Sequence, residues 1–142
     1  AEAYRERLDA AKAKADKPWG GTWALMRHSA VYDTEEDRAA TMDAIRGVLG
    51  QFGNLMMKKG EVNNGFPDPV PFEELEGNVR VNPEMLEENL LFGDPETVIG
   101  KLRRYEALGV DAFIYYASMG LDLERQKRSL GLFIDRVLPE FA

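Results

Sequence analysis

Apolar positions in the last third of the chain change their spacing twice, and the changes predict a helix, a strand and a second helix. Intervals of three and four residues mark one face of a helix, whereas the short apolar and aromatic run 110–116 fits a strand covered on both faces. A second helical pattern then continues to Pro139. The first helical face consists of Val98, Leu102, Tyr105 and Leu108.

The first of these helices has start and stop signals at its ends. Asp94 can accept hydrogen bonds from the free amides of the first turn, and Pro95 suits the first helical position. Gly109 suits the left-handed position just after the helix. The unit of helix, strand and helix is the repeat of a parallel α/β protein.

The first half of the chain predicts two more helices around one more strand. Residues 2–16 are rich in strong helix formers, and residues 22–32 are rich in residues that favour strands. Thr34 can cap a following helix, with Asp37 in the place of the capping-box acid. One face of that helix carries an apolar stripe that we assign to the core: Met42, Ile45, Leu49 and Phe52.

Periodicity fades over residues 53–92, which we interpret as a long irregular insertion or lid. Residues 63–71 are rich in turn formers, and 83–91 predict one short helix with Asn82 as its cap. A connection of this length serves either as a lid over a binding site or as a surface loop for packing or subunit contact. Both readings stay open.

Composition excludes several classes of protein. A net charge of −7 and a pI near 4.8 argue against nucleic acid as a partner. The absence of cysteine excludes disulfides, thiolate catalysis and metal sites built on sulfur. Membrane partners are not expected either, because no apolar run has the length of a membrane span and the charged first residues do not resemble a signal peptide. We expect a cytoplasmic protein.

Few residues have the spacing of known catalytic or metal sites. His28 lies inside the predicted strand 22–32 without the partners of a metal site, so we interpret it as a hydrogen-bonded histidine of the core or the sheet edge. Ser29 has no triad or nucleophile-elbow pattern around it. Glycines 47, 50 and 53 follow a helical pattern and do not form a phosphate-binding loop. No metal is predicted.

Several motifs together carry a resemblance to a known family. Gly93-Asp94-Pro95-Glu96 starts a helix, Gly109-Val110-Asp111 turns into a strand, and Val137-Leu138-Pro139 ends the last helix. Upstream, the segment 25–36 supplies a strand followed by the helix start Thr34-Glu35-Glu36. In this order and spacing, residues 91–141 resemble the carboxyl-terminal end of the luciferase-like flavin monooxygenases.

The resemblance implies an α/β fold, the carboxyl-terminal portion of a (β/α)8 TIM barrel. Because a whole barrel takes about 250 residues, residues 1–142 would form a single unit, holding roughly the last two strands of the barrel. The resemblance also implies FMN, or less often a deazaflavin, in an oxidoreductase that acts on a small organic substrate. The family's phosphate-binding residues lie in earlier strands, so the chain alone should bind flavin poorly and should associate with the remainder of the barrel or with a second copy.

Residues at the end of the last predicted strand would then line the substrate pocket, because the carboxyl ends of barrel strands form the active-site face. They are Tyr115, Tyr116, Ser118 and Met119. Alternation allows only one of the two tyrosines to point inward. The sequence gives no catalytic or cofactor-binding residue.

Two other classes of protein compete with the enzyme. One is a small α/β module that binds a partner and catalyses nothing, since no complete catalytic constellation is present. The other is a doubly wound nucleotide-binding domain, which is disfavoured because no glycine fingerprint follows either predicted strand.

Overall fold

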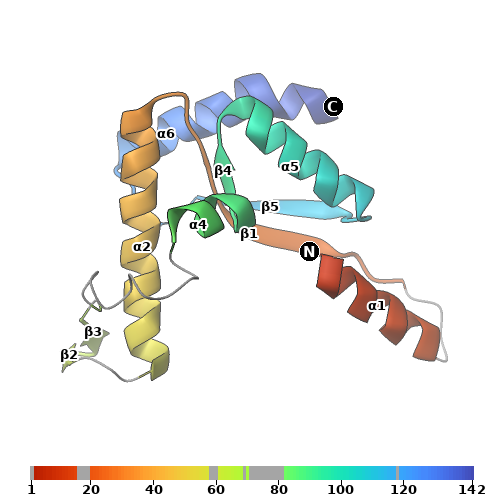
Figure 1. Cartoon of the computed structure of the whole chain (residues 1–142), viewed down its shortest axis with the longest axis horizontal. Helices are drawn as coiled ribbons and strands as arrows, with labels where there is room; N and C mark the ends of the chain where they lie inside the picture. Colours follow the sequence, from red (N-terminus) through yellow and green to blue (C-terminus); the bar gives the residue numbers. More distant parts are fainter. Residues whose placement is uncertain (1, 16–19, 58–60, 69, 71–81, 118) are drawn as a thin grey trace.

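The computed structural model describes residues 2–15, 20–57, 61–68, 70, 82–117 and 119–142, shown in Figure 1. Helices and strands follow one another in the order α1 Glu2–Lys14, β1 Ala24–Val31, α2 Glu35–Met57, β2 Val62–Asn63, β3 Phe66–Pro67, α4 Pro83–Asn89, β4 Leu91–Gly93, α5 Pro95–Ala107, β5 Ala112–Tyr116 and α6 Leu123–Leu132. A π-helical turn, η2 Phe133–Val137, and a 3-10 turn, η3 Leu138–Phe141, continue α6 to the end of the chain. Within these described ranges, no helix has the length and apolarity needed to cross a membrane.

A parallel three-stranded sheet lies at the centre of the fold, with β1 between β4 and β5. The two strands predicted from the sequence are therefore confirmed as β1 and β5, and they pair directly, with His28 opposite Tyr116. Strand β4 was not predicted, because its three residues are too few to show an alternating pattern. All three are buried, and this makes β4 part of the core.

The strand order differs from that of consecutive strands in a barrel. In a barrel each strand lies beside the next one in the sequence, whereas β5 pairs here with β1 and lies on the opposite side of it from β4. Some doubly wound sheets have the same order, in which the first strand lies between the second and the third. The structure shows an α/β sheet and does not show a closed barrel.

Each face of the sheet has its own hydrophobic cluster. On one face, Val31 and Leu91 pack with α5 and with the end of α6. On the other, Ala30 and Phe92 pack with apolar residues of α2 and α4. In Figure 1, α5 and α6 lie above β5, whereas α2 and α4 lie to its left. The second cluster covers only the carboxyl-terminal half of its face.

The helix signals read from the sequence are confirmed. The side chain of Asp94 accepts a hydrogen bond from the Thr97 amide at 2.8 Å, and Asn82 caps α4 in the same way. Thr34 Oγ1 accepts from the amide of Asp37 at 3.1 Å. Gly109 has a φ of +77° at the end of α5, which only glycine adopts without strain.

Helix α2 is longer than its apolar stripe suggested, and this corrects two expectations. It continues through the three glycines to Met57, so residues 53–57 are helical and not part of an irregular segment. Met42 and Ile45 are in the core as predicted, but Phe52 is 54% exposed, so its assignment to the core is wrong. The middle of the predicted insertion, residues 71–81, lies outside the described part of the chain.

Candidate functional site

One face of the sheet is uncovered over the amino-terminal half of β1 and over β5 up to its last residue, and we call it the open face. It carries Met26, His28, Ile114 and Tyr116, which alternate along β1 and β5 with residues of the covered face. Met26 and Ile114 are each about half exposed. A cavity of about 810 Å³ lies over this face. Its wall is formed by Met26, Arg27, His28, Val48, Phe52, Asn89, Leu90 and Tyr116.

The structure answers which of the two tyrosines faces the cavity. Tyr115 points to the covered face, where its hydroxyl lies 3.0 Å from Ser129 Oγ and its ring packs on Phe133. Burial raises the pKa of the Tyr115 hydroxyl. Tyr116 points to the open face and stacks on His28, with 4.6 Å between the ring centroids. Only Tyr116 lies on the cavity wall.

Of the other two residues predicted for the pocket, the structure describes only Met119, and it lies away from the cavity. Met119 is 1% exposed and belongs to the cluster formed by Ala30, Phe92 and the apolar side of α2. Its side chain therefore serves packing rather than the surface of the cavity. Ser118 lies outside the described residues.

His28 differs from the expectation of a hydrogen-bonded histidine. Its Nδ1 atom is buried, and within the part of the chain that the structure describes it has no hydrogen-bond partner. Burial lowers the pKa of the imidazole from its ordinary value of 6.5, so the ring is neutral at neutral pH. A neutral imidazole offers one donor and one acceptor. The open face therefore holds an unsatisfied polar atom beside an aromatic stack.

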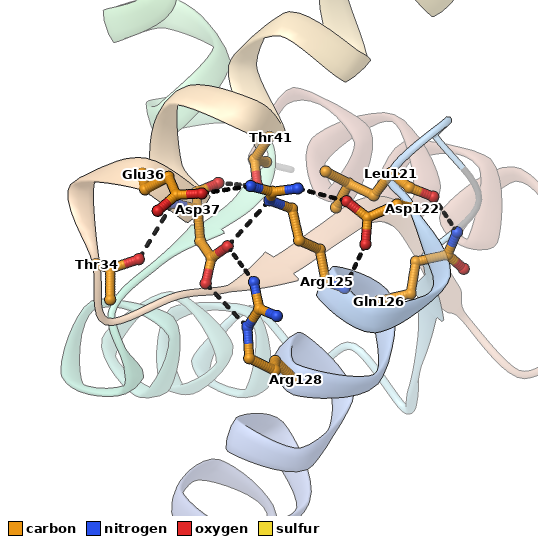
Figure 2. Close-up of polar contacts among 9 residues, drawn as sticks. All are labelled: Thr34, Glu36, Asp37, Thr41, Leu121, Asp122, Arg125, Gln126 and Arg128. Atoms are coloured by element: carbon orange, nitrogen blue, oxygen red, sulfur yellow. Dashed lines mark hydrogen bonds and ion pairs between the residues drawn. The ribbon is translucent and has the colours of Figure 1, made fainter.

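A group of ion pairs joins the amino-terminal ends of α2 and α6 beyond the carboxyl ends of β1 and β5 (Figure 2). We call it the clasp. Asp37 of α2 lies 2.6 Å from Arg128 and 3.2 Å from Arg125, both of α6. Arg125 also pairs with Glu36 and with Asp122. The hydrogen bond from Arg128 holds the pKa of the Asp37 carboxyl below its usual range.

The clasp argues against a nucleotide site at this end of the sheet. Doubly wound folds bind phosphate at helix amino termini in this position. Here the amide of Arg125 donates to Asp122 at 2.9 Å, and the amide of Asp37 donates to Thr34. The two arginines are matched by three carboxylates, so the cluster has no excess of positive charge for an anion.

A second polar group, around Lys101 of α5, has a structural role. The ammonium donates to the carbonyls of Glu87, Leu90 and Phe92, at 3.1 Å and 2.8 Å for the latter two. The Glu87 carbonyl lies in the last turn of α4 and the Leu90 carbonyl at its cap, where helices leave acceptors unpaired, and the Phe92 carbonyl belongs to β4. Burial lowers the pKa of Lys101. The lysine thus closes the junction of α4 and β4.

Glu87 also holds two side chains from the other end of the sheet. Its carboxylate accepts from Arg38 at 2.6 Å and from the Tyr32 hydroxyl at 3.2 Å. The hydrogen bond from Arg38 lowers the pKa of Glu87, and burial raises that of Tyr32. The polar groups of Glu87, Arg38 and Tyr32 thus serve as partners for one another. Among the described residues no cluster of three potential metal ligands occurs. The open face is therefore the best candidate site.

Sequence reasoning missed the contribution of His28 and Phe52 to this site. His28 meets Tyr116 only through the pairing of β1 with β5, whose register no local pattern reveals. For Phe52 a signal was present in the glycines on either side of it, Gly50 and Gly53, because small residues provide little packing surface.

A comparison with curated proteins finds a relative in Acinetobacter baylyi, the oxygenase component of a flavin-dependent trigonelline monooxygenase. It is 32% identical to this chain over 118 residues, or 83% of the chain. The chain spans about a third of that protein's length, 33%. No family model matches the chain.

Proposed function

We propose, from the confirmed kinship of this chain with the luciferase-like flavin-dependent monooxygenases, that it forms about a third of such an enzyme and supplies one wall of its substrate pocket. The observation that carries the proposal is the open face, where Tyr116 and His28 stack beside a cavity of about 810 Å³. Ligand pockets are typically walled by apolar and aromatic side chains with a few polar groups among them. The open face has this character.

The residues of the open face fit the ring end of FMN. An aromatic side chain offers a stacking surface, and the unsatisfied nitrogen of His28 offers a polar contact. We assign binding of the FMN phosphate to the remaining two thirds of the enzyme, as the family resemblance implies. A deazaflavin would fit the same face, because its three-ring system has the same planar shape. A reduced flavin supplies the activation of oxygen, while the protein orients the reactants and excludes water.

The whole enzyme takes reduced flavin from a separate reductase and oxygenates a small organic substrate. The basis is the name of the relative, which is an oxygenase component and acts on trigonelline. Trigonelline is therefore the first compound to test as a substrate. The reductase is the partner to test first.

The whole enzyme closes into an eight-stranded barrel, in which β1, β4 and β5 are consecutive. This requires β5 to exchange its pairing with β1 for pairing with β4, and α2 to pack on the outside. Val48 and Phe52 of α2 then leave the cavity wall, and the strand residues of the wall remain. The side chains of Met26, His28, Ile114 and Tyr116 then face the barrel interior, because alternation keeps them opposite the face that α5 and α6 cover. Inward side chains of alternate barrel strands share layers. His28 and Tyr116 then lie on alternate strands with β4 between them, and their side chains meet only within a shared interior layer.

Part of 53–92 forms a lid over the pocket. Its described hairpin, β2 with β3, is fastened to α2 through Asn54, whose side-chain amide donates to the Asp68 carbonyl at 2.6 Å. Limited proteolysis of the full-length enzyme with and without FMN tests this. Protection of the segment by FMN supports a lid, and equal cleavage rates contradict it.

The enzyme proposal is tested with the full-length protein, supplied with chemically reduced FMN and trigonelline under air. We expect a hydroxylated or ring-opened product detected by mass spectrometry, and a lower yield of product per flavin oxidised in Tyr116→Ala. Tyr4→Ala is the matched control, because Tyr4 is an exposed tyrosine on α1 away from the cavity. Failure of the protein to bind FMN in either redox state would contradict the proposal.

A further inference from the structure

We propose that His28 is a ligand-binding residue of the open face, where its imidazole hydrogen-bonds the polar edge of a planar heteroaromatic ring that lies against Tyr116. The inference rests on the proposed function, which brings two such rings to the cavity. One is the isoalloxazine of the flavin, and the other is the ring of a substrate similar to trigonelline. Both present polar groups in the plane of the ring.

The first support is the buried Nδ1 atom of His28, which has no hydrogen-bond partner among the residues that the structure describes. Buried nitrogen atoms of folded proteins nearly always have a hydrogen-bond partner, so each exception needs an explanation. The strand itself does not provide a partner, because β1 uses its main-chain groups in pairing with β4 and β5. A polar atom of a ligand placed at Nδ1 would supply the partner.

The second support is that two other polar side chains of the cavity wall, those of Arg27 and Asn89, already make hydrogen bonds within the protein. Arg27 donates to the carbonyl of Met26 at 2.8 Å, and the side-chain amide of Asn89 donates to the carbonyl of Met85 at 2.8 Å. Among the described residues of the wall, His28 is the polar side chain with an unsatisfied buried atom. It therefore offers a polar ligand group a buried contact that nothing else described on this wall satisfies.

The third support is the shape of the surface beside His28. Tyr116 is 39% exposed although its ring stacks on the imidazole, and its side chain lies on the cavity wall. Met26 and Ile114 extend the same surface with apolar side chains. Aromatic rings favour offset stacking on other flat rings, and a thioether adds favourable contact at their edges. A planar ligand suits this surface better than a flexible one.

The test uses the full-length enzyme and two probes, FMN and trigonelline, whose dissociation constants are measured by calorimetry. His28→Phe keeps a flat ring on Tyr116 but removes both nitrogens, whereas His28→Gln keeps a donor and an acceptor. We expect His28→Phe to weaken the binding of one probe about fivefold to tenfold, the loss of one hydrogen bond. His28→Gln should stay within about threefold of the parent enzyme, and Tyr4→Ala should match it.

The probe whose affinity falls identifies the ring that His28 contacts. If His28→Phe leaves both affinities unchanged while Tyr116→Ala weakens binding, the role of His28 is overturned and the proposed function stands. If the parent enzyme binds neither probe, both are overturned. If the His28 variants fail to fold, the parent enzyme is labelled with ¹⁵N in its histidine rings and studied by NMR. A His28 ring-nitrogen resonance that moves with neither FMN nor trigonelline overturns the inference.

Discussion

The behaviour of His28 as an acid can be measured directly, because it is the single histidine of the chain. Burial disfavours the charged imidazole, so we expect a pKa below 6.5 in the folded chain. As the pH falls, His28 of the unfolded chain binds a proton near pH 6.5, whereas His28 of the folded chain binds it only at a lower pH. The contribution of His28 to the free energy of unfolding is therefore fully present above pH 6.5 and falls as the pH drops toward the folded pKa. Proton NMR of the imidazole ring gives the pKa, and urea unfolding of His28→Gln should lack this part of the pH dependence.

Lys101 provides a second prediction at the level of one side chain. Lys101→Met keeps most of the apolar stem but leaves the carbonyls of Glu87, Leu90 and Phe92 without their donor. We expect a loss of about 2–3 kcal/mol in the free energy of unfolding. Lys127→Met is the control, because within the described part of the chain Lys127 pairs with Glu124 alone, an exposed pair worth under about 1 kcal/mol. Equal effects of the two substitutions in urea unfolding would contradict the role assigned to Lys101.

Residue roles were predictable from the sequence where the partners are local. Asp94 and Thr34 each bind an amide three residues away, so the motif contains the whole interaction. Lys101 reaches carbonyls nine to fourteen residues away on α4 and β4, and His28 reaches a ring on another strand. These contacts depend on tertiary packing, which one sequence without structure does not reveal.

At the scale of elements, the clasp links α2 to α6, and Asp37 is its central member. Asp37→Asn keeps the size of the side chain but removes the charge that faces Arg125 and Arg128. Asp37 is only 15% exposed in its side chain, so we expect a loss of about 1–2 kcal/mol in urea unfolding. Glu124→Gln, an exposed acid of α6 paired with Lys127, should change the free energy by less than about 0.5 kcal/mol.

The pH dependence of the same variant provides an independent check. The folded pKa of Asp37 is below its ordinary value of 3.8, so its stabilising effect is present above that value and is lost as the pH falls further. The difference in stability between the parent chain and Asp37→Asn should shrink in that acidic range. A difference that stays constant with pH would mean that the carboxylate charge is not what holds the clasp.

Elements were predictable in proportion to their length and periodicity. Helix α5 and strands β1 and β5 follow clear patterns and were found, whereas β4 has three residues and was not. The end of α2 was misjudged because glycine in a helix costs stability without forbidding the helix. Parallel pairing of β1 with β5 followed from the fold class, but the position of β4 on the far side of β1 did not.

At the scale of the whole molecule, the strand order separates this chain from the enzyme of which we propose it is a part. β5 occupies the edge of β1 that a preceding barrel strand would take, because strand edges without a partner pair with whatever strand is near. In a barrel, β4 must lie between β1 and β5. The two arrangements predict different neighbours for the same residues.

Engineered cysteines distinguish these arrangements cleanly, because the chain has no cysteine of its own. Met26 and Ile114 are register partners, and both are half exposed, so an oxidant can reach them. We expect Met26→Cys with Ile114→Cys to form a disulfide in the 142-residue chain, since neighbouring strands lie within the reach of that bond. Mass spectrometry after mild oxidation detects the bond, and the two single-cysteine variants are the controls for intermolecular pairing.

The same pair should stay reduced in the full-length enzyme, where the intervening strand separates the two positions by about 9–10 Å, twice the strand spacing. That distance is beyond a disulfide, whose α-carbons lie within about 7 Å of each other. Bond formation in both proteins would mean that β5 keeps its place beside β1. The whole enzyme would then contain an open sheet instead of a barrel, although its relationship to the flavin monooxygenase would be unaffected.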